Sequence, residues 1–243
     1  ECESLRHSAA KVDIDDDIAS TDAATALSPA TRADSSPVVA QFVQSISNVR
    51  AYQTLRKFDP VFFDGLVNTY EKLVGQSLSD KQVNDALRAK QAILMGQLLP
   101  RASDDAIISY AELIVDQLDE FQLYGTEPCL KLLVPPSDPD TDTSPIYSEK
   151  TKERELETLD IILRTYNADK RLPAQEDVWP DLDPIFAGLF DAFGADNVAA
   201  MENSYDPRID RVLVCNVSRA LYSGVLGLPK RKAANALRWL LAP

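Results

Sequence analysis

The segment SDDAIISYAELIVDQLDEFQLYG, residues 103–125, shows the two signals that decide the fold class of this chain. Ser103 is a favoured residue at a helix N-cap, and Asp104 and Asp105 follow it where the positive end of the helix dipole stabilises acidic side chains. Gly125 closes the segment, because glycine readily adopts the backbone conformation that ends a helix. The segment therefore predicts one helix with a defined start and a defined end.

The same start and stop signals recur on both sides of this segment. Upstream, helices are predicted from Pro37, from Asp59-Pro60 to Gly75, and from Ser79 to just before Pro100. Downstream, helix starts are predicted at Thr126, Ser148, Asp183-Pro184, Asp206-Pro207 and Pro229. Apolar residues repeat at helical spacing between these signals, and no segment alternates apolar and polar residues between hairpin turns. The sequence therefore predicts an all-α fold, a compact bundle of seven to nine short-to-medium helices.

The N-terminal segment has a different composition. Residues 1–36 are rich in Ala, Ser, Thr and Asp and contain an acidic cluster of four aspartates, Asp13, Asp15, Asp16 and Asp17. Such a segment has too few apolar side chains to bury a core. We therefore expect a polar, acidic spacer over residues 1–36 and a single α-helical domain over residues 37–243.

Composition excludes several classes of function. The chain has one histidine, His7, which lies in the predicted spacer, so Ser-His and Cys-His nucleophile pairs and most zinc sites are not expected. A net charge of −13 argues against nucleic-acid binding, because neutralising phosphates requires a surplus of Lys and Arg. No apolar run has the length of about 20 residues that a membrane-spanning helix needs. We expect a protein without a cofactor or metal that is not an enzyme.

The charge is unevenly distributed along the chain. Residues 207–243 carry seven Lys or Arg and one acid, a net charge of +6, which leaves −19 on residues 1–206. Lys230, Arg231 and Lys232 occupy the first turn of the last predicted helix, where the dipole disfavours cations by about 0.3–1 kcal/mol per charge. One interpretation is that they pair with acidic residues of the same domain. The other is that they bind an anion or an acidic partner, together with the N–H groups at the helix start.

Three cysteines bear on the cellular compartment. Cys2 lies in the spacer, whereas Cys129 and Cys215 lie in apolar segments that we predict to be helical. We predict a Cys129–Cys215 disulfide, and the alternative is two buried reduced cysteines. The chain begins with Glu1 rather than Met, and a spacer before a globular domain is typical of a tethered extracytoplasmic protein. We therefore expect a periplasmic or secreted protein, tethered through a segment before Glu1; the alternative is a cytoplasmic protein.

Two groups of carboxylates have the composition of a metal site or of an acid–base pair. The loop 138–149 places acids at the calcium-binding positions of an EF-hand, but Thr143 and Pro145 stand where that motif needs glycine and an apolar residue, so we expect an acidic surface loop. Four acids on one side of a predicted helix are expected to form a solvated face; these are Glu112, Asp116, Asp119 and Glu120.

Three hypotheses about function follow. The leading one is a non-enzymatic α-helical protein-interaction module that is extracytoplasmic and binds a protein partner through Lys230, Arg231 and Lys232 or through its acidic helix faces. The second is a carboxylate-based hydrolase of sugar or cell-wall substrates, because Asp177 and Asp181 flank Trp179, an aromatic on which a sugar could stack. The third is a cytosolic helical adaptor with the same architecture and reduced cysteines.

Overall fold

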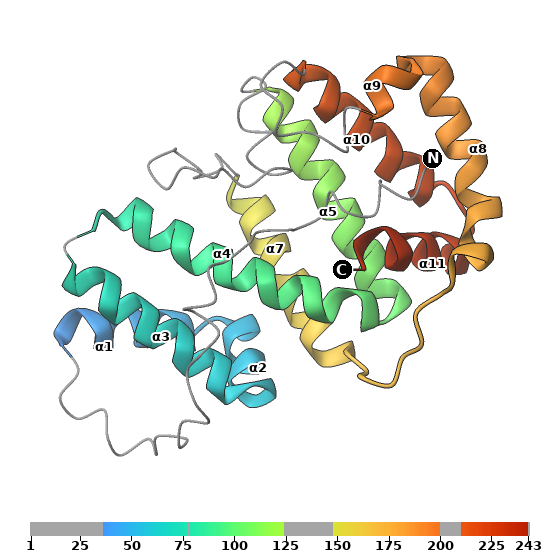
Figure 1. Cartoon of the computed structure of the whole chain (residues 1–243). Coiled ribbons are helices and arrows are strands. Elements are labelled where there is room, and N and C mark those ends of the chain that lie inside the picture. The colour runs from blue at the N-terminus through green and yellow to red at the C-terminus, as the bar shows by residue number, and fades with distance from the viewer. Residues whose placement is uncertain (1–35, 77, 124–147, 200–209, 243) are drawn as a thin grey trace.

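The structure, a computed structural model, describes residues 36–76, 78–123, 148–199 and 210–242. These residues form ten α-helices, one 3-10 helix and no strand, which confirms the all-α prediction (Figure 1). The helix count exceeds the expected seven to nine because the helix predicted from Pro37 is followed by a separate one, and because a short helix follows α8. The helices are α1 (Pro37–Ser47), α2 (Arg50–Phe58), α3 (Pro60–Gly75), α4 (Asp80–Leu98), η4 (Leu99–Arg101), α5 (Asp104–Gln122), α7 (Glu149–Thr165), α8 (Gln175–Phe193), α9 (Ala195–Ala199), α10 (Arg211–Leu226) and α11 (Lys230–Leu241).

Helix α5 occupies the centre of the arrangement (Figure 1). It packs against α7 on one side and against α10 and α11 on the other. The N-terminal helices join this centre mainly through α2, which packs along α7, while α8 covers α10 and α11. One main cluster of buried apolar residues contains side chains from every α-helix from α1 to α11. The predicted spacer lies almost entirely outside the described residues and stays a prediction.

The predicted helix starts at four polar residues are confirmed. In each case the side-chain oxygen of the capping residue accepts a hydrogen bond from the backbone N–H three residues later, which satisfies one of the unpaired donors of the first turn. The pairs are Asp59 with Phe62, Ser79 with Gln82, Ser103 with Ala106, and Ser148 with Thr151.

The predicted helix start at Asp183-Pro184 is wrong. Helix α8 begins at Gln175 and continues through both Pro180 and Pro184. A proline inside a helix removes a backbone hydrogen bond and costs about 3 kcal/mol. Burial of an apolar side chain stabilises by roughly 1.5–3 kcal/mol, so a buried stripe can offset that cost. The stripe on α8 recurs every three or four residues and consists of Val178, Leu182, Phe186 and Leu189.

The other helix ends near the gaps are only partly described. The predicted start at Asp206-Pro207, the short helix predicted from Thr126 and the stop at Gly125 lie outside the described residues. Within the described part, α5 ends at Gln122 and α10 begins at Arg211, with Asp210 as the N-cap that accepts from the Val212 N–H at 2.9 Å.

A buried carboxylate joins α2 to α7. Asp160 of α7 is 3% exposed and accepts a hydrogen bond from the Thr54 hydroxyl of α2 at 2.5 Å. It also forms ion pairs with Arg50 at 3.0 Å and with Arg164 at 2.7 Å. These donors compensate for the removal of the charge from water, so α2 is positioned along α7 by a polar contact as well as by apolar packing.

Among the described residues, no helical segment has the length and hydropathy of a membrane span.

Candidate partner-binding site

Two of the three cations at the start of α11 pair with acidic residues of other helices. Lys230 forms an exposed ion pair with Asp105 in the first turn of α5, and the hydrogen bond and charge of Asp105 raise the pKa of Lys230. Lys232 donates to Asp181 of α8 at 2.6 Å. Arg231 is exposed and forms no ion pair with any residue that the structure describes. The interpretation of internal charge pairing therefore holds for Lys230 and Lys232 but not for Arg231.

Two further cations of the C-terminal segment pair with α5. Arg219 of α10 forms an ion pair with Asp119, and this pair raises the pKa of Arg219. Arg238 of α11 is 1% exposed and donates to Asp104 at 2.7 Å. The basic C-terminal helices are thus held on the acidic central helix by charge, in addition to their apolar packing.

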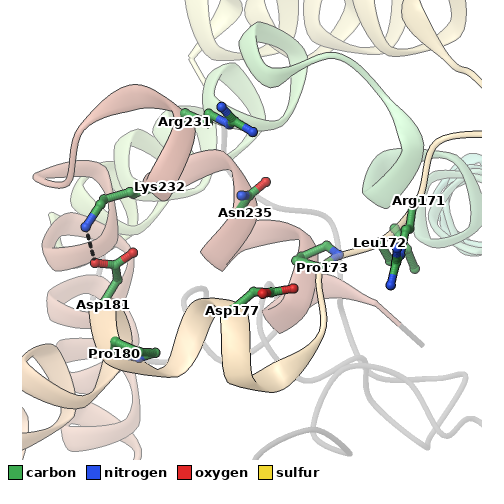
Figure 2. Close-up of a pocket in the computed structure, with 9 residues that line it drawn as sticks. All are labelled: Arg171, Leu172, Pro173, Asp177, Pro180, Asp181, Arg231, Lys232 and Asn235. Carbon is green, nitrogen blue, oxygen red and sulfur yellow. Dashed lines mark hydrogen bonds and ion pairs between the residues drawn. The ribbon is translucent and has the colours of Figure 1, made fainter.

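A groove lies between the start of α8, the start of α11 and the segment 171–173 that precedes α8 (Figure 2). Its volume is about 870 Å³. Figure 2 shows Asp177, Pro180 and Asp181 on α8, and Arg231, Lys232 and Asn235 on α11 across from them. The lining residues are Arg171, Leu172, Pro173, Asp177, Pro180, Asp181, Arg231, Lys232 and Asn235.

The charges in the groove do not all cancel. Lys232 and Asp181 neutralise each other. Asp177 uses one carboxylate oxygen to accept a hydrogen bond from the Ala174 N–H at 3.2 Å, and it thereby caps α8. Arg171 and Arg231 are both exposed, and neither forms an ion pair within the described ranges. Two arginines without an ion pair and one carboxylate that caps α8 therefore belong to the lining of the groove.

The aromatic residue of the predicted hydrolase site does not line the groove. Asp177 and Asp181 are four residues apart and lie on one face of α8, whereas Trp179 is turned toward the core. Its ring stacks on Phe186 with 5.7 Å between centroids and meets Trp239 edge-on at 5.8 Å. The helical structure of residues 175–182, which the sequence pattern did not predict, separates the acids from the aromatic.

Of the polar residues that line the groove, sequence reasoning missed Arg171 and Asn235. Asn235 follows Arg231 by four residues, so helical spacing alone could have placed it on the same face of α11. Arg171 lies in an irregular segment before Pro173, and no local pattern relates that segment to α11.

The predicted solvated face of α5 is confirmed for Glu112 and Asp116, whose side chains are 49% and 52% exposed, but its acids also contact other helices. Arg154 of α7 forms ion pairs with both Glu112, at 3.0 Å, and Asp116. Glu120 accepts hydrogen bonds from the Ser148 N–H at 2.5 Å and from the Thr151 hydroxyl at 2.6 Å. With the Asp119–Arg219 pair, all four acids contact α10, α7 or the Ser148 cap of α7. Periodicity shows that acids share a face, but it does not show which helix lies opposite.

The remaining predicted features are only partly described. Cys129 and the acidic loop up to Tyr147 lie outside the described residues. Glu149 lies in the first turn of α7 and forms an ion pair with Lys152 at 2.7 Å. Cys215 is 2% exposed and packs in a small apolar cluster with Ile114, Leu118 and Phe121. No group of three or more potential metal ligands occurs among the described side chains.

The groove thus brings together two regions that are about fifty residues apart in the sequence, the acids of α8 and the cations of α11. Both regions are needed to line the groove, and the hydrogen bond from Lys232 to Asp181 joins them. Comparison of the chain with models of known families, with curated proteins and with solved structures gives no match.

Proposed function

We propose that this protein is a non-enzymatic α-helical interaction module and that its protein partner binds in the groove between α8 and α11. The observation that carries this proposal is the position of Arg231. It lies at the groove and has no ion pair in the described part of the chain, while Lys230 and Lys232 on either side of it do. An exposed guanidinium offers paired donors that match a carboxylate.

The local energetics support this proposal. A cation in the first turn of a helix is opposed by the helix dipole by about 0.3–1 kcal/mol. Asp105 and Asp181 compensate for this at Lys230 and Lys232. Nothing in the described fold compensates for it at Arg231, and residues that break a local rule without compensation are concentrated at functional sites.

The test is recovery of a partner from the native source with the full chain as bait. We expect a protein that is recovered with the wild type and with Lys72→Ala, an exposed control on α3, but lost with Arg231→Ala. Arg231→Ala should be at least as resistant to thermal unfolding as the wild type, because the side chain has no ion-pair partner among the described residues and its charge opposes the helix dipole. Equal recovery of every binding protein with the wild type and with Arg231→Ala would contradict the proposal.

We further propose an extracytoplasmic location and a Cys129–Cys215 disulfide. The amide of Gln122, the last residue of α5, donates to the side-chain oxygen of Asn216 at 3.1 Å, so the chain leaves α5 beside Cys215. Cys129 follows Gln122 by seven residues, which can span at most about 25 Å. The pairing is therefore within reach, and a disulfide is typical of a periplasmic or secreted protein. Reduced cysteines would instead favour the cytosolic adaptor.

The carboxylate-based hydrolase is the second candidate, because Asp177 and Asp181 both line the groove. It predicts that Asp177→Asn abolishes hydrolysis of sugar or cell-wall substrates while the fold is kept. The interaction module is favoured over it because Asp181 is bound to Lys232, Asp177 caps α8, and Trp179 is partly buried against the core.

A further inference from the structure

The charges that remain uncompensated in the groove select for an acidic ligand. Lys232 and Asp181 cancel, which leaves the guanidinium groups of Arg171 and Arg231 against the carboxylate of Asp177. One oxygen of Asp177 already accepts the Ala174 N–H. The groove therefore offers more donors to a carboxylate than acceptors to a cation.

The uncharged part of the groove suits a peptide backbone. Asn235 is half-buried, its side chain forms no hydrogen bond to a described residue, and it lies on the α11 side of the groove (Figure 2). Its amide can donate to a backbone carbonyl and accept from a backbone N–H, which are the groups that an extended segment has unpaired. Leu172, Pro173 and Pro180 add apolar surface on the opposite side.

The size of the groove agrees with such a ligand. A volume of about 870 Å³ lies within the range of about 300–1,000 Å³ that is usual for ligand-binding clefts. The groove is open to solvent, so a chain can enter and leave it without ending inside.

The net charge of −13 does not prevent binding of an acidic segment. At physiological ionic strength the screening length is about 8 Å, so charges on distant helices contribute little at the groove. The nearby pairs with Arg171 and Arg231 then dominate the interaction.

We propose that the groove binds an extended segment of another protein that carries acidic side chains, with its carboxylates on Arg231 and Arg171. This inference rests on the proposed function and names the chemistry of the partner. Asn235 holds the backbone of the segment, while Lys232 and Asp181 keep α11 and α8 at the distance that forms the groove.

The experiment measures fluorescence anisotropy of labelled nine-residue peptides on the full chain. The peptides alternate alanine with aspartate, asparagine or lysine, so that only the charge differs. We expect the aspartate peptide to bind most tightly. Arg231→Gln and Arg171→Gln should each weaken it by about threefold to tenfold, since a charged hydrogen bond at an exposed site is lost. Lys72→Gln removes one positive charge away from the groove and should leave binding unchanged.

Three outcomes would overturn the inference. One is equal affinity for the aspartate and asparagine peptides, and another is unchanged affinity in both arginine variants whose thermal unfolding matches the wild type. The third is a gain of tenfold or more on deletion of residues 1–35, which would assign the groove to the chain's own acidic segment. If a partner is lost with Arg231→Ala but the aspartate peptide has no preference, the proposed function stands and only this inference fails.

Discussion

Arg238 shows what a single buried charge does in this protein. Its guanidinium, 1% exposed, donates to the Ala102 carbonyl at 2.9 Å and to Asp104 at 2.7 Å. Lys170 donates to the same carbonyl at 2.8 Å and to the same carboxylate at 3.3 Å. A buried cation requires such partners, because its removal from water is otherwise strongly unfavourable. The end of η4 and the start of α5 are thereby joined to α11.

The first prediction concerns the pH dependence of this contact. Partial burial raises the pKa of Asp104, but hydrogen bonds and positive charges from Arg238 and Lys170 lower it by more, so that it lies below the usual 3.8. A depressed pKa stabilises the folded state above the unfolded pKa, and this stabilisation is lost as the pH falls through the folded pKa. Asp104→Asn should therefore lower the melting temperature at pH 7, and the difference from wild type should shrink below about pH 4.

The control for this prediction is Asp105→Asn. Asp105 is 73% exposed and, among the described residues, pairs only with an exposed lysine, Lys230, so its replacement should change the melting temperature little at any pH. An Asp104→Asn variant with the same deficit at pH 3 and pH 7 would show that the charge of Asp104 does not stabilise the fold.

Glu155 of α7 has a raised pKa, in contrast to the lowered pKa of Asp104. Burial raises its pKa above the usual 4.5, and the charge of Arg88 on α4 lowers it by less. Two tyrosines respond to the same carboxylate: burial and then Glu155 raise the pKa of Tyr110 to about 12, and burial is also the main cause of the raised pKa of Tyr52. An ionised carboxylate here is less favourable than in the unfolded chain.

The second prediction follows from the sign of this shift. A raised carboxyl pKa means that the folded state loses stability as the pH rises from the unfolded pKa through the folded one. Glu155→Gln avoids this loss, so its melting temperature should exceed that of the wild type at pH 7 and equal it below about pH 4. Glu157→Gln, an exposed substitution on the same helix, should show no such difference. A lower melting temperature of Glu155→Gln at pH 7 would show that Glu155 is stabilising when charged.

At the scale of elements, the crossing of α8 and α10 depends on a glycine. A Cβ atom at Gly224 of α10 would lie 2.9 Å from the Cγ2 atom of Ile185 on α8, closer than carbon atoms pack. Ile185 is β-branched and has little freedom to rotate away. By contrast, a Cβ at Gly188 of α8 would meet nothing within 4 Å. Close packing of α8 against α10 therefore requires a glycine at position 224, whereas the space around position 188 would accept a larger residue.

The third prediction compares alanine substitutions at these two positions. Gly188→Ala should stabilise by up to about 1 kcal/mol, because alanine is the better helix former. Gly224→Ala gains the same propensity but forces the helices apart, and we expect a net loss of roughly 1–3 kcal/mol in urea unfolding. With Ile185→Ala in the background, Gly224→Ala should cost less, and equal costs in both backgrounds would exclude the contact with Ile185 as the cause.

At the scale of the whole molecule, the uneven charge of the sequence becomes a set of contacts between helices. The basic C-terminal helices pair with the acidic faces of α5 and α8 through Arg219, Lys230, Lys232 and Arg238. The last two helices thereby close onto the central helix, and the groove forms at the edge of this closure. The groove therefore lies where the basic helix α11 packs against the acidic side chains of α8.

The fourth prediction tests the covalent link proposed for the molecule. Native-source protein, alkylated under denaturing conditions without reductant, should take up label at one of its three cysteines, Cys2. Reduction should lower the free energy of unfolding by about 2–4 kcal/mol, because the unfolded chain is no longer constrained. Cys2→Ser should unfold like the wild type. Labelling of all three cysteines would exclude the disulfide and favour the cytosolic adaptor.

Local signals determined most of the helix starts. Ser79, Ser103 and Ser148 act through hydrogen bonds within one helical turn, so their role is independent of the rest of the fold. The start of α8 could not be predicted in this way. Its two prolines are unfavourable locally, and only the burial of its apolar stripe against α10 and α11 makes the longer helix stable.

The sequence by itself determined the fold class, the capped helix starts and the cluster of cations at Lys230–Lys232. Only the tertiary structure decided which of these cations are paired, because Asp105 and Asp181 are far from them in the chain. The same holds for the groove, which needs α8, α11 and the segment with Arg171 at one place. Capping and periodicity act over one or two helical turns, whereas the packing of helices determines which charged faces meet.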